Sequence, residues 1–175
     1  MCAGHQSMVA PPSPRIIPQR YTFELSAFGR VFAMHPKLRP SLVTITVRYT
    51  DWWYWEDLKP LELDSDHLRG IEFPQSVARI VMQLETIESH RKELEDLIGS
   101  MLNDPARWSF SRQDGVSLQI KKAKVLENTV QEWKWDGPTT FGDGRTFPHH
   151  PQGDTMPYII KVLTWEVFQP EAAFV

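Results

Sequence analysis

Residues 42–56 read LVTITVRYTDWWYWE, and this stretch combines the two patterns that decide the fold. Its first half alternates β-branched or aromatic residues with polar ones, which is typical of a strand with one buried face. Its second half places four aromatic residues in a row, from Trp52 to Trp55. Four neighbouring aromatic side chains are not all exposed without cost, so the domain, a ligand or a partner must cover most of them. Continued alternation predicts Trp53 and Trp55 on the core face, and Trp52 and Tyr54 exposed.

The rest of the domain follows the same kind of periodicity. Apolar residues at helical spacing predict one helix from about residue 25 to His35-Pro36 and a second helix over residues 90–103. Asp114-Gly115 predicts a tight hairpin turn. Alternating patterns predict strands over residues 42–55, 77–87, 108–112, 116–120, 125–135 and 158–168. The sequence therefore predicts an α+β fold, with a mostly antiparallel twisted sheet packed against two helices.

Composition limits the class of protein. The chain has 175 residues, a formal net charge of -3 and one cysteine, Cys2. This length suits one domain with a real core, and the charge does not favour nucleic acid or an anionic membrane. One cysteine excludes a disulfide within the chain, and neither a secretory signal nor a span of ~20 apolar residues is present. We therefore expect an intracellular protein, in the cytoplasm or nucleus.

The two ends of the predicted domain are set by composition. Residues 1–18 are rich in proline, serine and alanine, which predicts a disordered N-terminal tail. The expected domain is a single α+β unit over residues 19–170.

The aromatic row supplies the first candidate site, made of Asp51, Trp52, Tyr54 and Glu56. Exposed indoles beside carboxylates can stack on a sugar, hold a cation or anchor a protein interface. The alternative is that the rings only fill the core, because tryptophan is usually mostly buried.

Residues 139–157 form the second candidate site, a long loop rich in glycine, proline, histidine and aspartate. Its Asp143, His149, His150 and Asp154 could act as acid and base or ligate a metal, which makes an enzyme of unknown class one alternative. No HxxxH, HxD or HExxH spacing is present. We therefore expect no metal and no cofactor, and a polar surface loop is the simpler interpretation.

Four segments carry a resemblance to a known group of proteins. They are TITVRYTDWWYWE, WSFSRQDG, EWKWDGPTTFG and GDTMPYIIKVLTWE. Together they resemble the C-terminal region of uncharacterised filamentous-fungal proteins, some of which carry an F-box-like segment upstream. The resemblance covers roughly residues 28–166 and implies no activity. The chain has no F-box-like segment of its own, which weakens a role as a ubiquitin-ligase adaptor.

These observations favour a non-enzymatic, tryptophan-rich interaction or recognition module that binds an unidentified protein partner. Its expected contact surface combines the aromatic row with the long loop, through Asp51, Trp52, Tyr54, Glu56, His149, His150 and Asp154. Carbohydrate binding by tryptophan and tyrosine platforms is a further alternative.

Overall fold

The computed structural model describes residues 15–16, 25–52, 55–57, 59–121, 129–141, 143–147 and 153–167. Their helices are α1 (Leu25–Met34), α2 (Ser65–Arg69) and α3 (Arg91–Asn103), with short 3-10 turns η1 (Tyr49–Asp51), η2 (Trp55–Asp57) and η3 (Glu88–His90). Their strands are β1 (Arg15–Ile16), β2 (Leu42–Val47), β3 (Glu72–Phe73), β4 (Arg79–Ile87), β5 (Phe110–Arg112), β6 (Ser117–Ile120), β7 (Gln131–Pro138) and β8 (Thr155–Val167).

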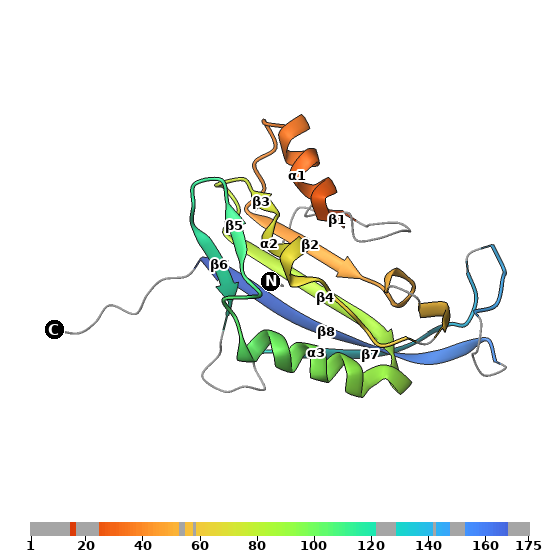
Figure 1. The fold of residues 1–175 in the computed structure, drawn as a ribbon. Coiled ribbons are helices and arrows are strands. Elements are labelled where there is room, and N and C mark those ends of the chain that lie inside the picture. Colours follow the sequence, from red (N-terminus) through yellow and green to blue (C-terminus); the bar gives the residue numbers. More distant parts are fainter. Residues whose placement is uncertain are drawn as a thin grey trace, which may run out of the picture.

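Strands β4 and β8 form the centre of one mixed sheet (Figure 1). They pair antiparallel over the whole of β4, from Arg79 opposite Glu166 to Ile87 opposite Tyr158. β2 runs parallel to β4, and β1 runs parallel to β2. The other edge of β8 is shared, because β7 pairs with residues 155–162 and β6 pairs with residues 165–167. β5 continues from β6, and β3 lies parallel to β5.

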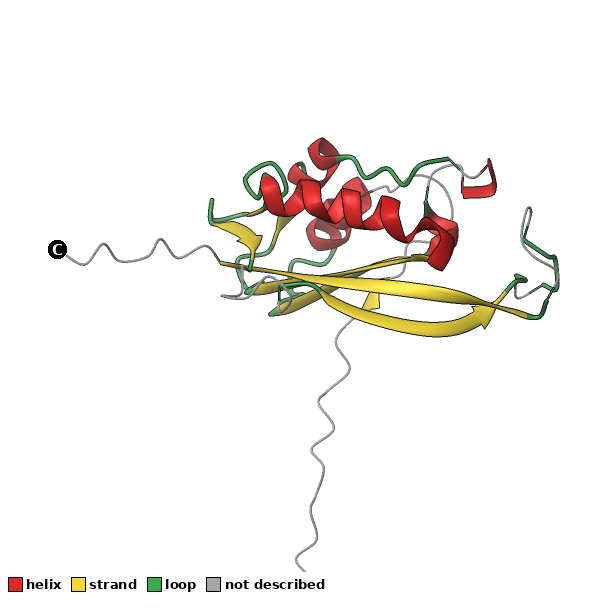
Figure 2. Cartoon of the chain, turned by 90° about the horizontal axis from the view of Figure 1, so that it is seen from below, coloured by secondary structure: helices red, strands yellow, loops and turns green. Residues whose placement is uncertain are grey.

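The core lies between this sheet and the helices, which gather on one face of the sheet (Figure 2). Every second residue of β2 and β4 points into it, as the alternation of each strand predicts. Fully burying one such aliphatic side chain stabilises the fold by roughly 1.5–3 kcal/mol. The core-facing positions of β2, β4 and α3 are Val43, Ile45, Val47, Ile80, Met82, Leu84, Leu94, Ile98 and Met101.

The sheet is mixed, so the expectation of a mostly antiparallel sheet needs correction. The parallel pair β2–β4 requires a long crossover, and the segment between Val47 and Arg79 supplies it with α2 on the way. The hairpin expectation is confirmed: β5 and β6 pair antiparallel, and Gly115 takes a positive φ of 80° in their turn.

The helices also differ from the expected pair. α3 is the one long helix in the described residues and packs on the sheet, as predicted, through its apolar stripe. α1 forms where predicted, but it lies at the opposite border of the same face (Figure 1). Its buried Phe32 packs against Phe73 of β3, with ring centroids 5.7 Å apart. One long helix, not two, therefore covers the sheet.

The strand expected over residues 42–55 is wrong beyond Val47. The chain leaves the sheet there because Asp51 closes a 3-10 turn: its backbone N–H donates to the Arg48 carbonyl (2.9 Å), and its carboxylate accepts the Arg48 N–H (2.9 Å). At the N-terminus, Arg15–Ile16 pairs with β2 rather than belonging to a wholly unstructured tail. The other residues of that expected tail lie outside the described part of the chain.

Candidate functional site

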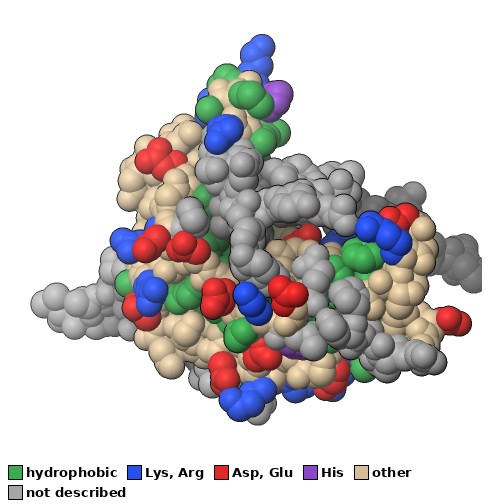
Figure 3. Space-filling view, turned by 45° about the vertical axis from the view of Figure 1, so that its right-hand side comes forward, with side chains coloured by type: hydrophobic (Ala, Val, Ile, Leu, Met, Phe, Trp, Pro, Cys, Tyr) green, Lys and Arg blue, Asp and Glu red, His purple; other side chains and the backbone are tan. Residues whose placement is uncertain are grey.

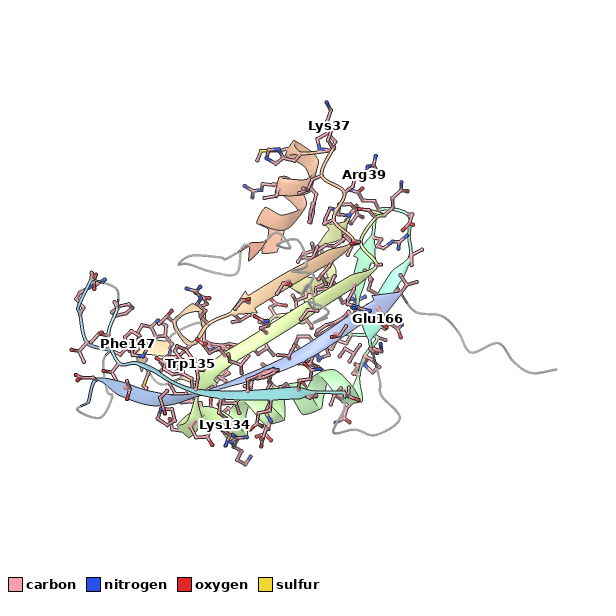
Figure 4. All side chains as sticks on the ribbon, turned by 180° about the vertical axis from the view of Figure 1, so that it is seen from behind. Lys37, Arg39, Lys134, Trp135, Phe147 and Glu166 are labelled. Atoms are coloured by element: carbon pink, nitrogen blue, oxygen red, sulfur yellow. The ribbon has the colours of Figure 1, made fainter. Side chains whose placement is uncertain are left out.

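The face of the sheet opposite α3 carries the exposed indoles of the described residues. On β7, Glu132 and Lys134 point toward α3, so alternation directs Trp133 and Trp135 to the other side, called the outer face below. Trp133 is 62% exposed and Trp135 is 43% exposed. Figure 4 looks at this face and shows Trp135 on β7 at the border of the sheet.

Residues of β8 lie beside these two indoles. In register, Trp135 lies opposite Tyr158, and Trp133 lies opposite Ile160. The rings of Trp135 and Tyr158 are stacked, with centroids 5.0 Å apart and planes 24° apart. Trp133, Trp135, Tyr158 and Ile160 are called the indole platform below. Stacking holds the partly exposed Trp135 in one orientation, and aromatic pairs of this kind contribute about 0.5–1.5 kcal/mol beyond area burial.

Gly137 makes room for this stack. A Cβ at this position would lie 2.6 Å from Cη2 of Trp135 and 2.6 Å from Cε2 of Tyr158. Tyr158 is fixed from its other end, because its hydroxyl donates to the carbonyl of Pro138 (2.8 Å). Burial raises the pKa of that hydroxyl, so it stays protonated as a donor.

A half-buried carboxylate lies beside the platform. Glu85 of β4 is opposite Ile160 on the outer face. Burial raises the pKa of its carboxyl, while hydrogen bonds from the Tyr49 backbone and the Trp135 side chain partly offset that rise. The carboxylate of Asp51 is close enough to raise the pKa of Glu85 slightly further, and burial raises the pKa of Asp51 as well. Arg48 is the cation that lowers both pKa values.

The helix-facing side of β7 is neutralised by an ion network. The Glu132 carboxylate accepts hydrogen bonds from Arg91 of α3 at 2.9 and 3.0 Å. It also pairs with Lys161 of β8, and Arg91 additionally pairs with Glu88 and Glu95. These hydrogen bonds lower the pKa of Glu132 to about 2. β7 is therefore anchored to α3 by charge, and its aromatic side is left open.

The exposure expected for Trp52 is wrong. Trp52 is only 3% exposed, and its Nε1–H donates to the backbone carbonyl of Glu85 (2.7 Å). The 3-10 turn at Tyr49–Asp51 ends the period-two pattern, so Trp52 turns inward. Trp55 is buried, as predicted. Asp51 is half-buried. Tyr54 and the side chain of Glu56 lie outside the described part of the chain.

The long loop contributes apolar rings to the same end of the sheet. Phe141 and Phe147 lie edge-on to Trp55, with centroids 5.6 and 5.2 Å away. Asp143 is exposed and pairs with Arg145 (2.7 Å). Asp154 is exposed too, and His149 and His150 lie outside the described residues. Within the described ranges, no group of three His, Cys, Asp or Glu residues is arranged to hold a metal ion.

The alternating pattern over residues 125–135 puts Trp133 and Trp135 on one side of the expected strand, but neither is among the site residues expected from the sequence. The signal was the pattern EWKWD at residues 132–136, in which charged residues alternate with the two indoles. A strand covered on both faces is apolar on both, so this pattern is typical of a strand with an open side. The longer aromatic row at residues 52–55 obscured that signal.

Comparison with protein-family models, with curated proteins and with solved structures finds no match to this chain. Among the described helices, none has the length and apolar character needed to cross a bilayer.

Proposed function

We propose that the protein is a non-enzymatic protein-recognition module that binds its partner through the indole platform. The exposure of Trp133 and Trp135 carries the proposal, because both are placed on an open sheet face rather than in the core. Tryptophan is the residue type most enriched among side chains that dominate binding energy at protein interfaces. Stacking on Tyr158 holds Trp135 before any partner arrives, so binding it costs little conformational entropy.

The charges around the platform favour a partner segment with a basic residue among apolar ones. Glu85 and Asp51 are half-buried carboxylates at this face, and Arg48 is the one cation that influences both. The basic residues of the neighbouring helix-facing side are already paired with Glu88, Glu95 and Glu132. Elsewhere the surface is mixed, and Figure 3 shows acidic and basic side chains interspersed on the face that it presents. A guanidinium or ammonium placed over an indole and near Glu85 gains from both groups.

The test compares partner capture by wild-type protein, Trp133→Glu and Met34→Glu. Met34 is 69% exposed and lies on α1, away from the platform, so its variant controls for a new surface charge. We expect Trp133→Glu alone to lose specific partners from cells that express the protein. With a purified partner, Trp133→Ala is expected to weaken binding by about 2 kcal/mol, or ~30-fold.

Two results would count against this proposal. Recovery of the same proteins in the same amounts with Trp133→Glu would show that the platform is not the contact surface. Sugar-dependent tryptophan fluorescence that disappears in Trp133→Ala, without loss of any captured protein, would instead favour the carbohydrate-binding alternative.

A further inference from the structure

β7 is an edge strand with an open side. Among the described strands it pairs with β8 alone. All of residues 131–136 are exposed, whichever face they point to, and in Figure 4 β7 forms the border of the sheet, with Lys134 projecting from it. A strand exposed in this way presents a row of backbone N–H and C=O groups that can pair with another strand.

We propose that a second copy of this chain pairs with β7, antiparallel and about a two-fold axis at Trp133, to form one sheet through both copies. The inference concerns the edge of β7, and Trp133 belongs both to this edge and to the platform, so the cross-linking test below is read from the purified protein alone, without any partner. The inference rests on the self-complementary order of side chains along β7.

The register follows from matching faces and charges. A two-fold axis perpendicular to the sheet keeps each side chain on the same face in both copies. Residues directly opposite each other must therefore share a face, which requires that one residue lies opposite the same residue of the second copy, next to the axis. With the axis at Trp133, Glu132 lies opposite Lys134 of the second copy, and this occurs twice. Each pair would extend the ion network that already joins Glu132 to Arg91 and Lys134 to Glu88. Opposite charges in directly facing positions stabilise a strand pair.

Neighbouring registers are disfavoured by the same side chains. An axis at Glu132 places that carboxylate opposite itself. An axis at Lys134 places two ammonium groups opposite each other and Glu132 opposite Asp136. An axis at Trp135 places Lys134 opposite Asp136, which is attractive, but it also brings Pro138, which has no N–H to donate, into the paired region opposite Glu132. Charges on an edge strand usually prevent promiscuous pairing, and here the charges together with Pro138 favour the register centred on Trp133.

The pairing also extends the indole platform. Directly opposite residues share a face, so Trp133 of one copy lies against Trp133 of the other on the outer face. Each indole then covers apolar surface that is open in the single copy, where Trp133 is 62% exposed. A short strand pair with two indoles buries less surface than the roughly 1,200 Å² in total that is typical of the smallest stable interfaces. We therefore expect a reversible dimer.

Cysteine cross-linking tests the register. In a background of Cys2→Ser, which removes the one natural thiol, Trp133→Cys is expected to form a disulfide-linked dimer rapidly on mild oxidation. Directly opposite Cα atoms in antiparallel strands lie about 4.5–5.5 Å apart, within disulfide reach. Gln131→Cys is the matched control, because the proposed register separates it from its own copy by about 14 Å. Met34→Cys reports random collision at an equally exposed site on α1.

Each outcome decides the proposal. Rapid cross-linking of Trp133→Cys alone supports it, while equal rates for all three variants, or a faster rate for Gln131→Cys, would overturn it. Sedimentation without cross-linking gives a second readout. The wild-type mass should rise with concentration, Trp133→Glu should stay monomeric, and Met34→Glu should behave as wild type; a wild-type protein that is monomeric throughout the range would end the proposal.

Discussion

At the scale of single residues, Asp51 determines that Trp52 of the aromatic row is buried rather than exposed. Its backbone N–H and its carboxylate both bond to the backbone of Arg48, and this closes the 3-10 turn in which the chain leaves the sheet. Trp52 then lies where its Nε1–H reaches the Glu85 carbonyl. One turn thus converts an expected contact residue into a core residue and leaves the exposed role to Trp133 and Trp135.

Gly137 offers a prediction at this scale. Gly137→Ala should destabilise the protein by roughly 1–3 kcal/mol, because its Cβ would lie 2.6 Å from the stacked rings of Trp135 and Tyr158. The rings must move apart or the strand must shift. Urea denaturation followed by far-UV circular dichroism measures the change in the free energy of unfolding. Trp135 fluorescence should change as well, since the ring loses its stacked position.

Gly99→Ala is the matched control for that substitution. Gly99 lies in α3, and a Cβ there meets no atom within 4 Å. Alanine in a helix interior stabilises the helix by about 1 kcal/mol relative to glycine, so this variant should be more stable than wild type. A Gly137→Ala protein as stable as wild type would show that the stack at the platform is not tightly constrained.

At the scale of elements, local signals in the sequence predicted what local interactions build. The apolar stripe of α3 and the Asp114-Gly115 turn between β5 and β6 both form where their spacing indicates. The parallel pairing of β2 with β4 could not be predicted in this way, because no short turn joins the two strands. The alternating pattern of each strand shows which of its faces is buried, but it does not show which strand lies next to it. The alternating charges of β7 indicate that one of its faces is exposed. That β7 lies at an edge of the sheet could not be predicted, because this depends on how all the strands are ordered.

The ion network that joins β7 to α3 gives a prediction about pH. The folded pKa of Glu132 is about 2, below the usual carboxyl value of 4.5. A lowered pKa means that the ionised form stabilises the fold, so this stabilisation is complete above about pH 4.5 and is lost as the pH falls toward 2. Glu132→Gln should therefore lower the free energy of unfolding at neutral pH by about 1 kcal/mol, allowing for solvent screening, and by almost nothing near pH 2.

Urea denaturation of wild type and Glu132→Gln at several pH values measures this difference. Asp96→Asn is the control, because Asp96 pairs with Lys92 on the exposed side of α3, with side chains 67% and 86% exposed. Solvent screens an exposed pair of this kind, so Asp96→Asn should change the free energy of unfolding little at any pH. If Glu132→Gln lowers stability equally at neutral and acidic pH, packing rather than charge holds β7 to the helix.

At the scale of the whole molecule, the sheet is covered on one face and open along β7. Its centre is secure: β4 is paired over its length with β8 on one edge and along much of the other with β2, under the buried side of α3. β7 has one paired edge and an exposed row of residues 131–136. Among the described residues, the large exposed apolar side chains are Met34 and Leu38 near α1 and the two indoles of β7, and both proposals place contact with another chain at these indoles.

Amide hydrogen exchange measures how stability differs between the centre of the sheet and β7, and it distinguishes a free strand edge from a covered one. In dilute protein, β4 should exchange slowest, because opening its amides requires disruption of the centre of the sheet, and β7 should exchange much faster. Raising the protein concentration should then slow exchange in β7 while leaving β4 unchanged, because a second copy that binds the edge protects the amides that face outward. Trp133→Glu should remove that concentration dependence without altering exchange in β4. Protection of β7 equal to that of β4 in dilute wild-type protein would show that its edge is already covered within one copy.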